Sequence, residues 1–204
     1  KAGTRLNEVQ MLLAGDLLNQ IISAGFAARN LGIPFYGLYG ACSTMSESLS
    51  VGGMLVDGGF ADRLICATCS HFCTAERQYR FPLEYGGVRP PTAQWTVTGA
   101  GALILAAAGN GPRMTMATTG TIVDAGIADT NNMGAAMAPA AYETLRAHFA
   151  DTGRTPDDYD LIVTGDLGKI GHAVVTRLFA DDGVDLTDRY NDCGLMIYDL
   201  EAQD

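Results

Sequence analysis

The sequence has 204 residues, 48% of them hydrophobic, which is enough for the core of one large domain or two small ones. Its net charge of −10 argues against a nucleic-acid-binding protein, and no apolar run approaches the roughly 20 residues that span a bilayer. Five cysteines without compact spacing and a polar beginning indicate reduced thiols and an intracellular protein without a signal peptide.

The first half of the chain alternates apolar runs with amphipathic segments. The apolar runs predict buried strands at residues 9–14 and 33–39 and a further strand at 62–69. Residues 95–108 are predicted to form a strand pair or one long strand with a glycine kink. Helices are predicted up to about Leu31 and at 45–56, and a long irregular segment covers 70–94. The apolar side chains expected to face inward on these helices are Ile22, Phe26, Ala27, Leu49, Met54 and Leu55.

The second half continues this alternation. Strands are predicted at residues 113–122, 160–164 and 193–198. Helices are predicted at 140–151 and 169–181, and the first has an apolar stripe of Tyr142, Leu145 and Phe149. Strands that alternate with helices of about a dozen residues indicate the α/β class with a largely parallel sheet.

One short pattern occurs twice. Residues 11–17 read MLLAGDL and residues 161–167 read LIVTGDL, so an apolar run ends in Gly-Asp-Leu before a helix in both places. The repeat predicts a duplicated α/β unit, with halves at residues 1–111 and 112–204. Ligands bind at the carboxyl ends of parallel strands. Three polar residues there are therefore candidate ligand-binding residues: Asp16, Asn19 and Asp166.

Cys42 follows a predicted strand and a Gly-Ala turn, and it directly precedes a predicted helix. The same strand–turn–helix geometry exposes the nucleophile of other hydrolases and transferases. The free amides and the dipole of that helix are expected to lower the thiol pKa, and Ser43 joins Cys42 as a candidate binding residue. The alternative is that Cys42 is a small buried residue of the core.

The segment from Cys66 to Cys73 carries three cysteines and His71, which invites interpretation as a metal site. Cys66 and Cys69 are three residues apart on a strand, so their side chains point to opposite faces. No second pair of closely spaced ligands exists, and we expect neither a bound metal nor a cofactor. His71 is a candidate ligand-binding residue at a strand end, or else a surface histidine.

Residues 76–89 gather three arginines and three aromatic residues in an otherwise acidic chain. Arginines bind carboxylates and aromatic rings stack on flat ligands, so this segment is a candidate lid over a planar anion, with Arg77 and Arg80 as contacts. A solvated loop or a subunit contact explains it equally well. No ligand-binding role is predicted for the other two histidines. His148 is expected to be exposed, and His172 is expected to have a structural role.

The order of these elements resembles the thiolase-like superfamily, which includes the ketoacyl-ACP synthases. The resemblance implies a duplicated, five-layered α/β/α/β/α fold, here incomplete at both ends, with Cys42 at the position of the nucleophile. Six motifs more closely resemble the stage V sporulation protein AD family. They are Ala14–Gln20, Tyr39–Thr44, Thr74–Gln78, Leu83–Gly87, Met137–Ala141 and Asp192–Tyr198.

The resemblance implies binding of dipicolinic acid, with calcium as part of the ligand, together with other stage V sporulation membrane proteins at the spore inner membrane. It also implies a homodimer packed through the first-half sheet edge. Condensing enzymes of the superfamily place a catalytic histidine just past the second-half strand, where this chain reads Thr164-Gly165-Asp166. A non-catalytic binder is therefore expected. The alternatives are a Cys42-dependent acyltransferase acting on a thioester and a purely structural subunit.

Overall fold

The computed structural model describes residues 3–18, 21–71, 90–199 and 202. The chain forms two compact units, the first from Lys1–Gln78 with Val97–Ala117 and the second from Tyr79–Thr96 with Thr118–Asp204. The change from the first unit to the second thus lies a few residues beyond position 111. The described residues 90–96 also belong to the second unit, where the Gln94 side chain donates hydrogen bonds to two of its carbonyls.

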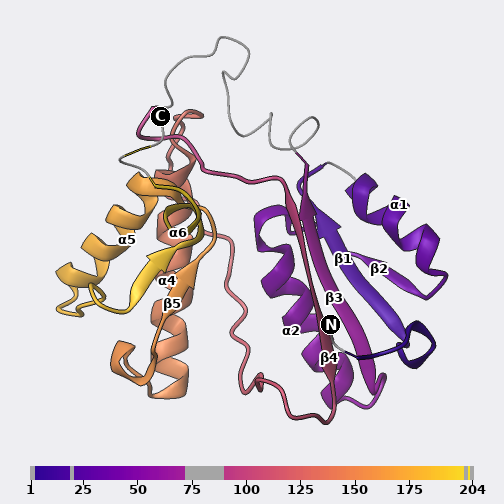
Figure 1. The fold of residues 1–204 in the computed structure, drawn as a ribbon. Helices are drawn as coiled ribbons and strands as arrows, with labels where there is room; N and C mark the ends of the chain where they lie inside the picture. The colour runs from indigo at the N-terminus through magenta and orange to yellow at the C-terminus, as the bar shows by residue number, and fades with distance from the viewer. Residues whose placement is uncertain (1–2, 19–20, 72–89, 200–201, 203–204) are drawn as a thin grey trace. The chain divides into compact units, whose positions relative to one another are not determined.

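The first unit contains a four-stranded sheet in the order β2-β1-β3-β4 (Figure 1). The strands are β1 (Met11–Asp16), β2 (Phe35–Gly37), β3 (Arg63–Ser70) and β4 (Gly99–Ala106). β1 pairs in parallel with both β2 and β3, and β4 is antiparallel to β3. The four predicted strands of the first half are therefore present, with residues 99–106 as one strand rather than a pair, and the parallel core of the sheet agrees with the predicted class. β1 is buried as predicted, whereas β2 is only partly buried.

Helix α1 (Ile22–Leu31) packs on one face of this sheet through small residues. Ala24 and Ala28 are buried with Leu12 of β1, whereas Ile22 and Phe26 are 47% and 63% exposed. Ala27 is exposed as well. The predicted inward-facing side chains of α1 were wrong, because the helix turns its Ala24 and Ala28 face toward the sheet, with Leu31 packed against the same cluster.

Helix α2 (Thr44–Asp57) packs on the opposite face. Its buried positions are Thr44, Ser48 and Gly52, spaced four residues apart. A Cβ atom on Gly52 would lie 3.0 Å from a methyl group of Leu64, so the helix lies close to β3. Leu49 and Leu55 pack against the core as predicted, but Met54 is 61% exposed, contrary to the prediction.

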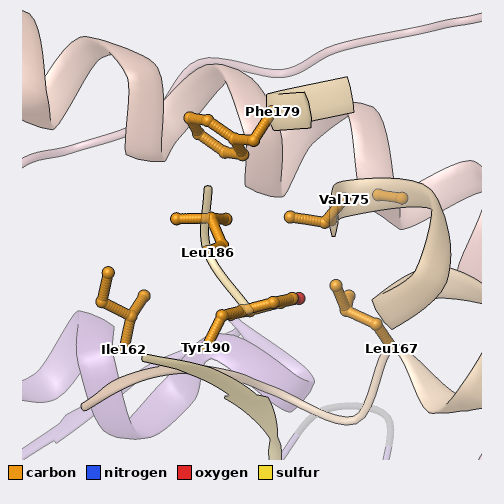
Figure 2. Close-up of a cluster of buried hydrophobic side chains, with 7 residues drawn as sticks. Ile162, Leu167, Val175, Phe179, Leu186 and Tyr190 are labelled. Carbon is orange, nitrogen blue, oxygen red and sulfur yellow. The ribbon is translucent and has the colours of Figure 1, made fainter. Parts of the chain in front are cut away.

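The second unit has a two-stranded parallel sheet of β5 (Ile162–Thr164) and β6 (Tyr190–Asp192). Its helices are α4 (Met133–Thr152), α5 (Gly168–Asp181) and the short α6 (Cys193–Ile197). Figure 2 shows how apolar side chains from these elements and their connections form one core. The predicted stripe of α4 packs against this core, as expected.

Two predicted strands of the second half were wrong. Residues 193–198 form mainly the short helix α6, because the side chain of Asp192 accepts a hydrogen bond from the Gly194 amide and so caps a helix there. Residues 113–122 lie in the irregular segment 107–132 between β4 and α4, and within the described chain they pair with no strand.

The predicted repeat extends to the pairing of the strands. Ala14 of β1 lies opposite Gly37 of β2, and Thr164 of β5 lies opposite Asp192 of β6. Ala14 and Thr164 each directly precede their Gly-Asp-Leu sequence, so the two strand pairs have the same register. Among the described helices, none combines the length and apolar character needed to cross a membrane.

Candidate functional site

The three parallel strands of the first unit end at one edge of their sheet. Asp16 is the last residue of β1, the turn that carries Cys42 follows β2, and His71 directly follows β3. The parallel pairing therefore brings three of the predicted site residues to the same edge. The carboxyl edge of a parallel sheet is the usual location of ligand sites in α/β folds.

Cys42 lies in a single 3-10 turn, Ala41–Ser43, that leads directly into α2. Its side chain is exposed, which excludes the alternative of a buried core cysteine. Ala41 has φ of 49°, a left-handed conformation that is strained for a residue with a side chain. The backbone thus bends sharply just before the thiol, as the predicted strand–turn–helix geometry requires.

The start of α2 has no side-chain cap among the described residues. Ser43 occupies the cap position, but its hydroxyl donates to the carbonyl of Gly40 at 2.9 Å instead. The first amides of a helix have no partner inside the helix and carry the positive end of its dipole. The amides of Ser43 and Thr44 donate to the carbonyls of Gly40 and Ala41 in the 3-10 turn. The turn therefore combines an exposed thiol with the positive end of the α2 dipole, which suits a carboxylate or an oxyanion.

Asp16 is buried, and its carboxylate accepts hydrogen bonds from the amides of Leu18, at 2.8 Å, and Ala24, at 2.7 Å. These bonds fix the connection from β1 to the first turn of α1. Asp16 thus has a structural role that was not predicted, and its role toward a ligand stays a prediction.

The thiols of β3 lie on opposite faces of the sheet, as predicted. Cys66 is buried in the core beside α2, where its Sγ donates to the Ser48 carbonyl at 3.1 Å, and burial raises its pKa. The pKa of Cys69 is raised by burial and by the nearby carboxylate of Asp16. Both thiols therefore favour the neutral form. The described residues contain no group of three acidic, cysteine or histidine side chains placed to hold a metal.

In the second unit, the buried carboxylate of Asp192 organises the strand ends. It accepts hydrogen bonds from the Thr164 hydroxyl at 2.9 Å and from three backbone amides, those of Leu167, Gly168 and Gly194. Burial raises its pKa, although these four donors oppose the shift. One side chain thus joins β5, β6 and the starts of α5 and α6.

Asp166 is half-buried beyond the end of β5. Its Oδ1 would lie 2.3 Å from a Cβ atom on Gly194, so the carboxylate packs against the start of α6. Burial raises the pKa of the neighbouring Cys193 thiol, and the charges of Asp192 and Asp166 add to the effect. The loop after β5 is therefore a carboxylate-rich environment that disfavours a thiolate.

The two histidines of the second unit are built into its packing. The ring of His172 stacks on Tyr190 with centroids 4.6 Å apart, which agrees with its predicted structural role. His148 was predicted to be exposed, but it is half-buried, and both of its ring nitrogens form hydrogen bonds, with Thr118 and Tyr159. The sequence did not indicate this burial, because the two hydroxyls that bond to the His148 ring come from segments outside α4.

Three predicted site residues, Asn19, Arg77 and Arg80, lie outside the described residues. Two acidic residues without a predicted role, Asp192 and Glu47, lie at the starts of helices. Glu47 lies in the first turn of α2, and its Oε2 is buried without a hydrogen-bond partner among the described residues. Asp192 could have been found as an Asp directly before a helix start, and Glu47 as an acidic residue in a first turn.

Comparison with known proteins adds a family assignment. The whole chain, residues 1–204, matches the family model described as Stage V sporulation protein AD. The chain is 50% identical over 197 residues to Stage V sporulation protein AD of Bacillus subtilis (strain 168), which covers 97% of the chain. The chain spans only 58% of the length of that relative.

The fold resembles the folds of solved structures at low sequence identity. Cerulenin-bound OleA of Xanthomonas campestris has a TM-score of 0.67 at 15% identity, over 95% of this chain and 62% of its own. The 3-oxoacyl-[acyl-carrier-protein] synthase III of Aquifex aeolicus has a TM-score of 0.61 at 14% identity, over 91% of this chain and 62% of its own. At these identities the similarity shows a shared thiolase-like fold and nothing about activity.

Proposed function

The chain belongs to the stage V sporulation protein AD family, with a thiolase-like fold, and we propose that it binds dipicolinic acid rather than catalysing a reaction. In this proposal calcium enters as part of the ligand. The protein acts with stage V sporulation membrane proteins at the spore inner membrane, during uptake or release of dipicolinic acid. The observation that carries the proposal is the start of α2, which has no side-chain cap and lies beside the exposed Cys42 at the carboxyl edge of the sheet.

The residues at the carboxyl edge of the first unit's sheet suit such a ligand. Dipicolinic acid is a flat pyridine with two carboxylates, and the positive end of the α2 dipole would stabilise one of them beside Cys42. His71 at the end of β3 and the predicted contacts Arg77 and Arg80 would add donors or positive charge. Calcium would offset the negative charge that Asp16 and Glu47 place near this edge.

The histidines of the chain support a non-catalytic role. The sequence contains three, and two of them are held in the second unit by stacking or by hydrogen bonds on both ring nitrogens. The strand end of β5 carries Gly165 and Asp166 where condensing enzymes have a catalytic histidine. A general base for Cys42 would therefore have to be His71, or a group from outside the described residues.

The second candidate function, a Cys42-dependent acyltransferase on a thioester, is favoured by the exposed thiol and the strained Ala41 that precedes it. Alkylation of Cys42 by iodoacetamide across pH 6–9 separates the two functions. An acyltransferase requires fast alkylation near neutral pH, whereas a thiol that reacts only toward pH 9 supports a binding role. Cys193, exposed in the second unit, provides an internal comparison.

The main experiment is calorimetric titration of dipicolinate into the purified protein, with and without calcium. We expect saturable binding, weakened by Cys42→Ala and by Arg77→Ala. Cys193→Ala and Arg113→Ala, which change an exposed thiol and an exposed arginine elsewhere, should leave the affinity unchanged. An absence of both heat and ligand-induced stabilisation at millimolar dipicolinate would overturn the proposal and leave a structural role.

We also propose a homodimer that forms through the edge of the first sheet. β2 is an edge strand of the described sheet, and its Tyr36 is 56% exposed. An edge strand offers unpaired backbone groups to a second copy. Sedimentation analysis of Tyr36→Lys against the unmodified protein tests this, because a charge at the edge should shift the protein toward the monomer. A protein that is monomeric before the substitution contradicts it.

A further inference from the structure

The sequence Asn-Gly occurs once in the chain, at Asn110-Gly111. The carboxamide of an asparagine can be attacked by the backbone nitrogen of the next residue, which closes a five-membered ring. Glycine favours this attack, because it has no Cβ atom to crowd its own nitrogen. Each of the other six asparagines precedes a residue with a side chain. Asn110 is therefore the asparagine of this chain that is most open to chemical modification by its own backbone.

The fold leaves Asn110-Gly111 without structural restraint. The pair lies just after β4, at the start of the irregular segment 107–132 (Figure 1). The Ala107 amide ties this segment to the sheet through a hydrogen bond to the Asp62 carbonyl, at 3.0 Å. Residues 107–117 are all exposed, and from 108 to 117 they form no hydrogen bond or ion pair within the described part of the chain. Both the Asn110 carboxamide and the Gly111 N–H therefore face water.

There is also room for the ring to close. A Cβ atom on Gly111 would meet no heavy atom within 4 Å, and the same holds for Gly109 on the other side of Asn110. A packing contact of the segment comes later, where the terminal methyl group of Met114 lies against Gly53 of α2. Among the described residues, no neighbouring element therefore holds the Asn110 side chain away from the Gly111 nitrogen.

Two Asp-Gly pairs provide an internal contrast, because aspartate can close the same ring. They are Asp57-Gly58 at the end of α2 and Asp182-Gly183 just after α5. The glycine N–H of the first pair donates to the Met54 carbonyl at 2.9 Å, and that of the second donates to the Ala180 carbonyl at 3.0 Å. The nitrogen must lose its proton to attack, and these hydrogen bonds at helix ends hold the proton in place. The structure therefore protects the two Asp-Gly pairs and leaves Asn110 unprotected.

We propose that Asn110 is a site of spontaneous deamidation, in which the chain modifies itself through a succinimide. The Gly111 nitrogen gives up its proton and bonds to Cγ of Asn110, and the carboxamide nitrogen leaves as ammonia. Water then opens the ring at one of its two carbonyls. Opening at Cγ leaves an ordinary aspartate, whereas opening at the main-chain carbonyl leaves an isoaspartate, in which the chain continues through Cγ. Water is the only co-reactant, and nothing is oxidised or reduced.

Both products change the surface of the first unit without removing a described contact. The new carboxylate makes the net charge of −10 one unit more negative. Isoaspartate also adds a methylene group to the main chain, which residues 108–117 can absorb because none of them is hydrogen-bonded within the described chain. Its free main-chain carboxylate is the group that isoaspartate methyltransferases methylate with S-adenosylmethionine. Deamidation at this site therefore makes the aged protein a substrate for that class of enzyme, independently of ligand binding.

Peptide mass spectrometry of the purified protein, kept at mildly alkaline pH both folded and in urea, tests this assignment. In the folded protein we expect Asn110 to be converted to aspartate and isoaspartate. Unfolding should change its rate by less than about threefold, because the pair is already open to water. At Asp57 and Asp182, unfolding should speed isomerisation about tenfold, because the hydrogen bond that holds the glycine N–H is lost. An Asn110 that stays intact in the folded protein and reacts only in urea overturns the proposal.

Two variants identify the attacking nitrogen and the carbon that it attacks. Gly111→Ala adds a methyl group where there is room and where φ is not left-handed, so it should keep the fold and slow deamidation about tenfold. Asn110→Gln would have to close a larger ring, so after ageing its peptide should accept no methyl group from an isoaspartate methyltransferase. Asn30→Gln, at an exposed position of α1, is the control and should deamidate at Asn110 like the unmodified protein. Deamidation as fast in Gly111→Ala as in the unmodified protein also overturns the proposal.

Discussion

The two Gly-Asp-Leu segments have the same sequence, but the carboxylate that binds the backbone amides after them comes from a different place in each unit. In the first unit, the Asp of the motif, Asp16, bonds to the amides of the following connection and of α1. In the second unit, the amides at the start of α5 bond to Asp192, which lies on the neighbouring strand β6. The same local task is therefore performed by a carboxylate from within the motif in one unit and from across the sheet in the other.

The strand register explains the difference. Asp192 lies opposite Thr164, and the equivalent position in the first unit is Gly37, opposite Ala14. Even a Cβ atom on Gly37 would lie 2.1 Å from Cδ1 of Ile21, so the first unit has no room for a carboxylate there without rearrangement. In both units the backbone amides that follow the repeated motif need a carboxylate as acceptor. The residue on the neighbouring strand determines whether that carboxylate comes from within the motif or from across the sheet.

The largest effect is expected from Asp192→Ala. The substitution leaves three amides and a hydroxyl without their acceptor in a buried site, and we expect a loss of about 3–5 kcal/mol in the free energy of unfolding of the second unit. Asp16→Ala removes the acceptor of two amides and should cost about 1–3 kcal/mol. Urea denaturation measures both, with the exposed Asp188→Ala as control. Equal costs for Asp192→Ala and Asp188→Ala would contradict this assignment.

The glycines of the two motifs provide a second contrast. A Cβ atom on Gly15 would lie 2.2 Å from the carbonyl oxygen of Leu38, whereas one on Gly165 meets nothing within 4 Å. Gly15→Ala should therefore destabilise the first unit by about 2–4 kcal/mol, because backbone must move. Gly165→Ala should change stability by less than about 0.5 kcal/mol. Similar changes in melting temperature for both variants would contradict the difference in packing around Gly15 and Gly165.

A smaller effect is expected at Thr164, which occupies the position of Ala14 in the repeat. Its hydroxyl donates to Asp192 and lies 2.9 Å from the Tyr190 hydroxyl. Thr164→Val should cost about 1–2 kcal/mol in stability and speed hydrogen exchange in β5 and β6. Thr164→Ser, which keeps the hydroxyl, should restore most of the loss. A serine variant as unstable as the valine variant would indicate packing rather than the hydrogen bond.

The smallest effect is a dependence on pH. Burial raises the folded-state pKa of Asp192 above its ordinary value of 3.8, so its favourable contribution is present below that value and lost as pH rises through the folded-state pKa. The exposed Asp158 has the opposite sign, because hydrogen bonds from Thr155 lower its pKa. Urea midpoints of the unmodified protein and Asp192→Asn between pH 4 and 7 measure the difference. An unchanged pH slope in Asp192→Asn would contradict it.

Much of the fold could be predicted from local patterns. The apolar runs located the four strands of the first unit, and the Cys42 turn was found because a strand, a small-residue turn and a helix start follow one another in the sequence. The gathering of Asp16, Cys42 and His71 at one sheet edge was also accessible, because parallel strands end on the same side. Each of these features depends on a few neighbouring residues and on one rule of sheet geometry.

Only the tertiary structure showed which side chains are buried between elements and which polar groups from distant segments meet. It buried Ala24 and Ala28 in place of Ile22 and Phe26, because the packing of α1 on the sheet fixes which face of the helix turns inward. It also selected Asp192 as the cap of α5 and placed His148 between Thr118 and Tyr159, since both depend on partners distant in sequence. The sequence alone therefore determined where the strands and the thiol turn lie. Which side chains those elements bury, and which polar groups meet, followed only from their packing.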